Sequence, residues 1–179
     1  MSLYRLPLRS LAFVVLLVAG GASLAATPPI TLPDGRTVQL SAKAIESLPR
    51  LSVSATAHGK TARYGGYDLR QVLEAAGVRA SALRGRAMTT IVTVSAPDGY
   101  HAVFALAELD PTLGNRQVLL ADRENGQPLP PATGPWRLVV PADQRPARWV
   151  RQVNAIAVSN PQAARTDQGP RSATAAAAH

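Results

Sequence analysis

The sequence predicts an α+β fold, with a β-rich, mixed-sheet, barrel-like core and short peripheral helices. Three observations support this prediction. Short β-rich runs recur along the chain and end at Gly, Pro or Asp turn residues. Stretches with helical spacing of apolar residues are few and short. The length that remains after an N-terminal leader suffices for one ordinary hydrophobic core.

The first half of the chain contains paired strands followed by capped helices. Ser41 and Asp68 are expected to cap helices over residues 42–48 and 69–76. Gly77 then ends the second of these helices. The pair Gly65-Gly66 is expected to break the strand before it. The strands predicted in this half cover residues 30–32, 36–40, 51–57 and 60–64.

The second half is dominated by strands. Residues 89–95 are nearly all β-branched and give the strongest strand signal. One further helical turn is expected to open at Ser81, and another over 105–109. The turn after the strand at 117–121 is expected over 123–126. The remaining strands are expected over residues 100–104, 117–121, 137–140 and 149–158.

The domain organisation predicted is a signal peptide over 1–25, one domain over 26–158 and a disordered tail over 159–179. Residues 1–25 combine a basic start, a short apolar run and a small-residue cleavage site. The alternative, an uncleaved membrane anchor, is disfavoured because the apolar run is shorter than the ~20 residues that span a bilayer. The chain is therefore expected to be periplasmic or secreted through a Sec-type signal, with no membrane span after cleavage.

Composition excludes several classes of function. The sequence contains no cysteine, which excludes disulfides, thiolate metal ligands and cysteine nucleophiles. The formal charge is +8, but the arginines are scattered and aromatic residues are few, so nucleic-acid binding is not expected. No Gly-x-Ser-x-Gly motif is present. A metal site would need His58 and His101 to lie close together, with Asp98 as a third ligand. Isolated surface histidines are the usual case, so no metal site is predicted.

The stretch 134–158 is interpreted as a strand, a polar loop and a second strand. The loop and the residues just beyond it gather Asp143, Arg145, Arg148 and Arg151. Guanidinium groups held on a loop between strands can take an anion in forked hydrogen bonds. The alternative is a solvated basic turn.

Four segments, in order, resemble the oxidoreductase molybdopterin-binding domain, the sulfite oxidase fold. They share the family pattern of a glycine before a Leu-rich helix, a strand ending in Asp-Gly-Tyr, an Asn-Gly-x-Pro-Leu turn, and a Gly-Pro strand leading to Arg-Trp. They cover residues 64–73, 96–100, 119–129 and 134–141, the last followed by 147–151. The resemblance implies a mixed β-rich fold with peripheral helices, and molybdopterin as the family's cofactor.

The chain departs from the family's catalytic members in two ways. In those members a cysteine sulfur binds the molybdenum, and the matching region here, about 53–58, has none. The leader also lacks the Arg-Arg pair typical of proteins that fold and bind their cofactor before export. We therefore expect no bound cofactor, with molybdopterin suggested by the resemblance alone.

Two functional hypotheses follow. The first is a binding module for a small anionic ligand or an envelope protein, in which Arg145, Arg148 and Arg151, together with Asp143, form the anion site and Asp98 and Tyr100 orient the ligand. The second is a molybdopterin-dependent oxidoreductase that acts on a small oxyanion or a sulfoxide-type substrate.

Overall fold

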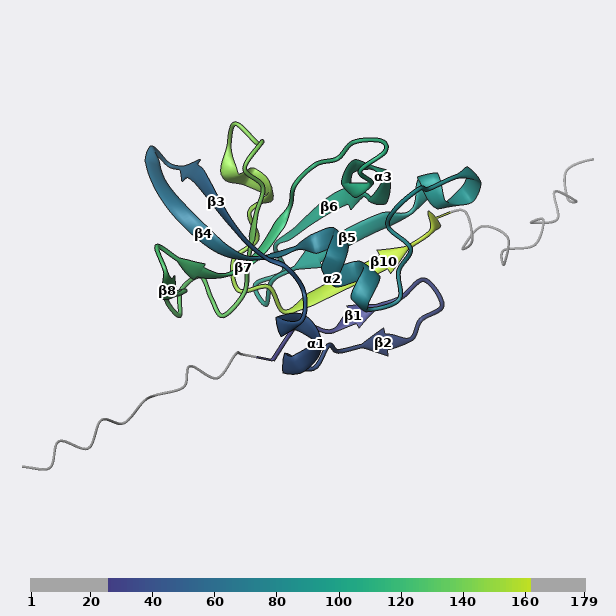
Figure 1. Ribbon diagram of the computed structural model, residues 1–179, viewed down its shortest axis with the longest axis horizontal. Coiled ribbons are helices and arrows are strands. Elements are labelled where there is room, and N and C mark those ends of the chain that lie inside the picture. Colours follow the sequence, from purple (N-terminus) through teal and green to yellow (C-terminus); the bar gives the residue numbers. More distant parts are fainter. Residues whose placement is uncertain (1–25, 162–179) are drawn as a thin grey trace, which may run out of the picture.

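The computed structural model describes residues 26–161, so the predicted signal peptide and residues 162–179 of the predicted tail lie outside the described part (Figure 1). Within the described part, no helix is long and apolar enough to cross a bilayer. The chain forms two sheets and a few short helices. The predicted α+β fold with a mixed β core is confirmed, although the strand orders are those of two open sheets and not of a closed barrel.

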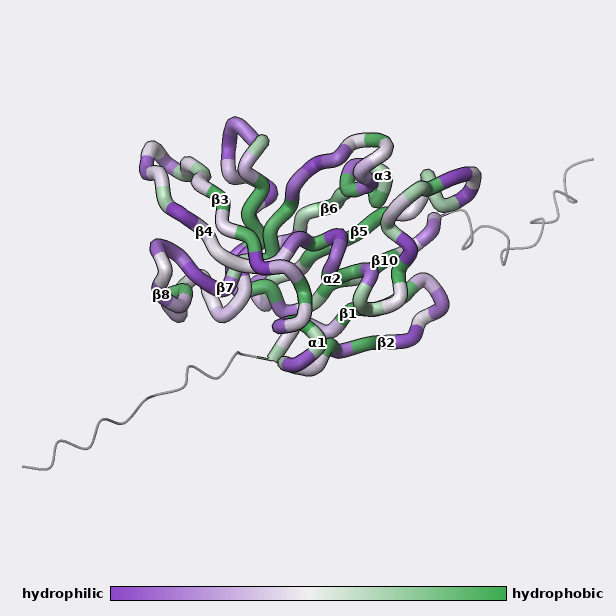
Figure 2. The backbone as a smooth tube through the Cα atoms, viewed as in Figure 1, coloured by the Kyte–Doolittle hydropathy of each residue, from purple (hydrophilic) through white to green (hydrophobic). Residues whose placement is uncertain are grey.

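The first sheet is mixed and has the order β2-β1-β10-β5-β6. β1 runs parallel to β10, and the other neighbours are antiparallel. Hydrophobic residues gather along β5 and β10 in the middle of the molecule (Figure 2). The strands of this sheet are β1 Ile30–Thr31, β2 Thr37–Val38, β5 Ile91–Ser95, β6 His101–Ala105 and β10 Ala155–Ser159.

The second sheet is antiparallel, has the order β3-β4-β7-β8, and carries β9 on β7. Its long β3–β4 hairpin lies with β8 at one end of the molecule, opposite α3 and the β1–β2 hairpin (Figure 1). The strands are β3 Arg50–Ala57, β4 Lys60–Asp68, β7 Leu119–Glu124, β8 Gln127–Pro128 and β9 Arg137–Val139.

Short helices occupy the connections between strands. Ser41 and Asp68 cap α1 and α2 as expected, since their side chains accept the N–H groups of Ala44 and Arg70. Gly77 follows α2 with φ +95°, as a C-terminal glycine should. The helices are α1 Ala42–Glu46, α2 Leu69–Ala75 and α3 Leu106–Leu109, with 3₁₀ turns η1 Gly85–Thr89 and η2 Pro146–Arg148.

The glycine pair does not end a strand, which corrects the expectation for Gly65-Gly66. β4 continues through both residues to Asp68, with an irregular register against β7 between them. A Cβ on Gly66 would lie 2.2 Å from the carbonyl oxygen of Leu120. Gly66 is therefore required by the close approach of β7, and it marks a bulge within the strand.

Other boundaries differ because turn residues lie elsewhere than expected. Ser81 opens no helical turn; its hydroxyl donates to Glu74, and the helical turn is η1. β7 runs on to Glu124, so the turn is formed by Asn125 and Gly126, both with positive φ.

The expected strand over 149–158 is also shorter, because only β10 has strand structure. Residues before it bond to the β9 region instead: the N–H of Val153 donates to Trp136 O at 2.8 Å. Gln152, with φ +50°, interrupts extended structure there. The segment 134–159 thus crosses from the second sheet, through β9, to the first, through β10.

Candidate functional site

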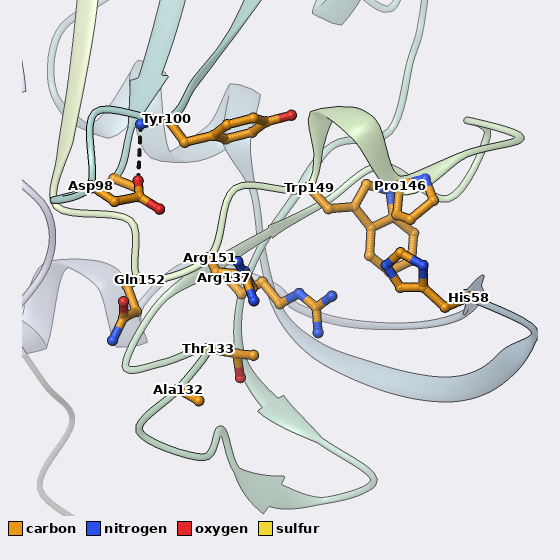
Figure 3. A pocket seen from close by; sticks show the side chains of 11 residues that line it. His58, Asp98, Tyr100, Ala132, Thr133, Arg137, Pro146, Trp149, Arg151 and Gln152 are labelled. Atoms are coloured by element: carbon orange, nitrogen blue, oxygen red, sulfur yellow. Dashed lines mark hydrogen bonds between the residues drawn. The ribbon is translucent and has the colours of Figure 1, made fainter.

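A cavity of about 490 Å³ lies where the β5–β6 turn, the 132–133 loop and the η2 loop meet (Figure 3). Asp98 and Tyr100 come from the β5–β6 turn, and His58 comes from the tip of the β3–β4 hairpin. Arg137 and Arg151 lie in the middle of the view, with the β5–β6 turn on one side and His58 on the other. Segments far apart in the sequence thus bring two guanidinium groups to one opening.

Arg137 is the buried charge of the cavity, with only 11% of its side chain exposed. Its guanidinium lies 5.4 Å from the ring centres of both Tyr64 and Trp149, in the range of cation–π contacts. Nη1 is 3.9 Å from a carboxylate oxygen of Glu124, and Nε is buried with no hydrogen-bond partner among the described residues. Arg137 is therefore held by aromatic rings and incompletely satisfied by hydrogen bonds.

The two rings around Arg137 form a fixed wall. Tyr64 and Trp149 meet edge to face, with 5.6 Å between ring centres. The Trp149 indole donates to Val140 O at 3.0 Å, and the Tyr64 hydroxyl donates to Glu124 at 3.3 Å. Burial raises the pKa of Tyr64 against the opposing effect of the Arg137 charge, so the hydroxyl stays protonated at neutral pH.

The outer rim of the cavity is more polar and more exposed. Asp98 accepts the backbone N–H of Tyr100 at 2.9 Å. The Tyr100 ring is 48% exposed, and its hydroxyl donates to Ala147 O, which ties the β5–β6 turn to the η2 loop. Arg151 is exposed and makes no ion pair or side-chain hydrogen bond to any residue within 26–161.

Three of the predicted site residues, Asp143, Arg145 and Arg148, lie outside this cavity lining. The Arg148 fork donates to both oxygens of Asp143, at 2.9 and 2.7 Å, and Asp143 raises the pKa of Arg148 further above its ordinary value. Arg145 is exposed on the same loop. The structure thus brings together Asp98, Tyr100 and Arg151, and separates them from the other three, whose role in anion binding stays a prediction.

Arg148 and Asp143 belong to a surface cluster of charges. Arg148 also donates to Glu108 at 3.3 Å and lies 4.7 Å from the Phe104 ring centre. Arg116 bridges the same two acids, at 3.1 Å from Glu108 and 3.3 Å from Asp143. With both acids engaged by two arginines, this cluster fixes the η2 loop against α3.

Arg137 was not among the site residues predicted from the sequence, where it was interpreted only as the start of an apolar strand. The signal was nevertheless present, because Arg137 is the one charged residue in the run 136–140. An arginine in a core strand needs a partner or a ligand. His58 was weighed as a metal ligand together with His101, yet only His58 lines the cavity.

The side chains of the described residues do not form a metal-binding cluster. No group of three or more His, Cys, Asp or Glu able to hold a metal ion occurs within residues 26–161. The complete sequence contains no cysteine that could supply a thiolate. The residues present therefore do not fit the metal end of a thiolate-ligated cofactor, while the arginines suit an anionic group.

Residues 35–166 match the family described as the oxidoreductase molybdopterin binding domain. The chain belongs to this family. The match covers all four segments on which the resemblance was based, and it confirms the recognition made from the sequence.

A solved structure gives the same fold. The sulfane dehydrogenase SoxCD from Paracoccus pantotrophus matches with a TM-score of 0.56 and 18% sequence identity. The match covers 74% of this chain and 38% of that one, so the chain spans well under half the length of that relative. No curated protein matches the sequence at a significant level.

Proposed function

We propose that this family member is an exported binding domain that holds a small anion in the cavity around Arg137 and Arg151, without a thiolate-ligated molybdenum centre. The observation that carries the proposal is the pairing of a buried, incompletely hydrogen-bonded Arg137 with an unpaired Arg151 at one cavity. Asp98 is the single carboxylate in the lining, so positive charge is in excess. An envelope protein that presents such an anion is the corresponding partner.

Two features of the chain support the absence of a working metal centre. The thiolate that binds molybdenum in catalytic relatives has no counterpart, because the chain contains no cysteine. Oxygen ligands of Ser or Thr are harder than thiolate and are poor substitutes for it. The N-terminal leader, with Arg5 and Arg9 apart, favours export in the unfolded state, before a cofactor could be loaded.

Anion binding can be tested by following the two tryptophan indole N–H signals in a ¹⁵N NMR titration of the purified protein with inorganic sulfate. Trp149 lines the cavity, whereas Trp136 is buried elsewhere and serves as an internal control. We expect the Trp149 signal to shift to saturation and the Trp136 signal to stay in place. Absence of a saturable Trp149 shift would remove the proposal.

The chain offers a matched pair of arginine variants for the same titration. Arg145 and Arg151 are both exposed and lie six positions apart, but only Arg151 lines the cavity. We expect Arg151→Ala to weaken sulfate binding about tenfold, since a charge-assisted hydrogen bond is worth roughly 1.5–3 kcal/mol. Arg145→Ala should leave binding close to that of the unchanged protein, because Arg145, an anion ligand predicted from the sequence, lies outside the cavity lining. Equal weakening by both variants would show general charge attraction instead of a site.

Family membership favours a second candidate, a molybdopterin-dependent oxidoreductase that acts on a small oxyanion or sulfoxide-type substrate. In this case the arginines of the cavity would hold the anionic part of the cofactor, and a ligand other than sulfur would face the metal. Molybdenum and pterin in protein isolated from the cells that make it would favour this candidate over the first.

A further inference from the structure

A second basic hollow, of about 320 Å³, lies on the face of the second sheet away from the cavity. Arg50 and Ser52 on β3, Arg63 on β4 and Arg123 on β7 surround it. Gly65 lies between them, paired with Ser52 on one side and with Arg123 on the other. We call this the Gly65 groove.

The groove and the cavity are on opposite faces of the sheet. Successive residues of a strand point to opposite faces. Tyr64 points to the cavity side, where its ring packs against Trp149, and Gly65 therefore faces the other way. A ligand in one hollow makes no direct contact with a ligand in the other.

Neither backbone conformation nor packing requires a glycine at position 65. Gly65 does not have positive φ. A Cβ there would meet Arg123 Cβ and Arg50 Nη2 at 3.6 Å, which is ordinary van der Waals contact, whereas at Gly66 it would collide with Leu120. Glycine in a strand interior is less favourable than alanine, because it loses more conformational freedom on folding. The missing side chain leaves the backbone of Gly65 as the floor of the groove.

The charges around this floor are strongly unbalanced. Arg50 pairs with Asp122, whose side chain is 9% exposed, and also donates to the Tyr67 hydroxyl at 3.2 Å. Arg123 donates to Gly126 O and has no acidic partner within residues 26–161. The guanidinium of Arg63 makes no hydrogen bond or ion pair within the same range. Of these three guanidinium groups, only that of Arg50 is paired with a carboxylate among residues 26–161.

We propose that the Gly65 groove binds a small divalent oxyanion of the sulfate or phosphate type. Arg63 and Arg123 supply the hydrogen-bond donors and the Ser52 hydroxyl adds another, while Arg50, fixed by Asp122 and Tyr67, completes the ring. Planar guanidinium groups suit the oxygens of such an anion. The site is independent of the cavity proposed above as the main binding site.

The test is a ¹⁵N NMR titration with inorganic sulfate in which the amide signals of Gly65 and Ser52 report on the groove. We expect both signals to shift to saturation with sulfate and to stay in place with chloride at matched ionic strength. Arg63→Ala should weaken this response about tenfold, while Arg84→Ala, which removes an exposed arginine outside the groove, should not change it. An equal response to chloride would overturn the proposal.

A second pair of variants separates the groove from the cavity and from loss of folding. Gly65→Val should fill the floor and abolish the Ser52 shift, with the thermal midpoint of unfolding retained as a check of the fold. Arg151→Ala should weaken the Trp149 response and leave the Gly65 response unchanged. Unchanged sulfate binding in folded Gly65→Val would refute the groove, whatever the outcome at Trp149.

Discussion

At the scale of single residues, Arg137 is a charged side chain that is almost fully buried. Its charge lies beside the rings of Tyr64 and Trp149, and these rings and Glu124, 3.9 Å away, offset the loss of water. Its Nε is buried and has no hydrogen-bond partner among residues 26–161. Such a residue contributes to packing and offers binding capacity at the same time.

Replacing Arg137 with methionine should therefore affect stability and binding together. We expect Arg137→Met to lower the free energy of unfolding by roughly 1–3 kcal/mol, because two cation–π contacts and the ion pair with Glu124 are lost. Urea denaturation measures this change. Arg145→Ala is the control and should stay within about 0.5 kcal/mol of the unchanged protein. A variant as stable as the starting protein would show that the aromatic contacts contribute nothing.

The two adjacent glycines should respond in opposite ways to the same substitution. Gly66→Ala places a Cβ 2.2 Å from Leu120 O and 2.6 Å from the Ala121 Cα, both backbone atoms. We expect it to cost about 3 kcal/mol or more, through displacement of β7 or failure to fold. Gly65→Ala should be neutral or stabilising by up to about 1 kcal/mol. Thermal unfolding of the pair measures both, and similar losses would contradict the geometry.

At the scale of elements, Asp110 links the segment around Leu83 to the turn that follows α3. Its carboxylate is buried and accepts the N–H of Leu83 at 2.7 Å, together with the N–H and hydroxyl of Thr112 at 2.8 and 2.7 Å. The hydrogen bond from Leu83, with those from Thr112, outweighs burial and lowers the pKa of Asp110 from 3.8 to about 2.

This lowered pKa predicts a defined pH dependence of stability. A carboxyl group whose pKa is lower in the folded state stabilises the protein above its unfolded pKa, and this contribution is lost as the pH falls through the folded pKa. The free energy of unfolding should therefore decrease between about pH 4 and pH 2. Asp110→Asn should be less stable at neutral pH and should show a shallower decrease. Parallel curves for the two proteins, from urea denaturation at each pH, would contradict this role.

The helix caps and most strands could be predicted from local sequence, whereas element boundaries near position 150 could not. Ser41 and Asp68 act on N–H groups two or three residues away, so short-range reasoning suffices. Residues 149–153 look β-rich, yet they do not extend β10. The Val150 carbonyl accepts the N–H of Leu138, and the N–H of Val153 donates to Trp136 O, so these residues bond to the β9 region instead. Such competition between a local preference and a tertiary hydrogen bond is not visible in the sequence.

The candidate site was predictable only in part, for the same reason. The charged loop suggested an arginine cluster, but Arg148 is engaged by Asp143 and Glu108, which lie five and forty positions away in the sequence. The cavity instead uses Arg151 from that region and Arg137 from β9. Which arginines are paired depends on partners that only the fold brings together.

At the scale of the whole molecule, the chain combines the fold of a molybdopterin-binding family with a composition that lacks the sulfur ligand. The family match spans residues 35–166, so the departure lies in chemistry and not in architecture. Within the described residues, two basic hollows lie on opposite faces of the second sheet. We therefore propose an anion-binding domain without redox turnover.

The molybdenum and pterin content of the protein, isolated from the cells that naturally make it, tests this central claim most directly. Protein from a host that cannot make the cofactor would not be informative, so elemental analysis and pterin fluorescence should be run on native material. If the protein lacks a molybdenum centre, as we propose, it contains far less than one molybdenum atom and one pterin per chain. A content near one of each would contradict the proposed absence of a molybdenum centre and would favour the molybdopterin-dependent oxidoreductase.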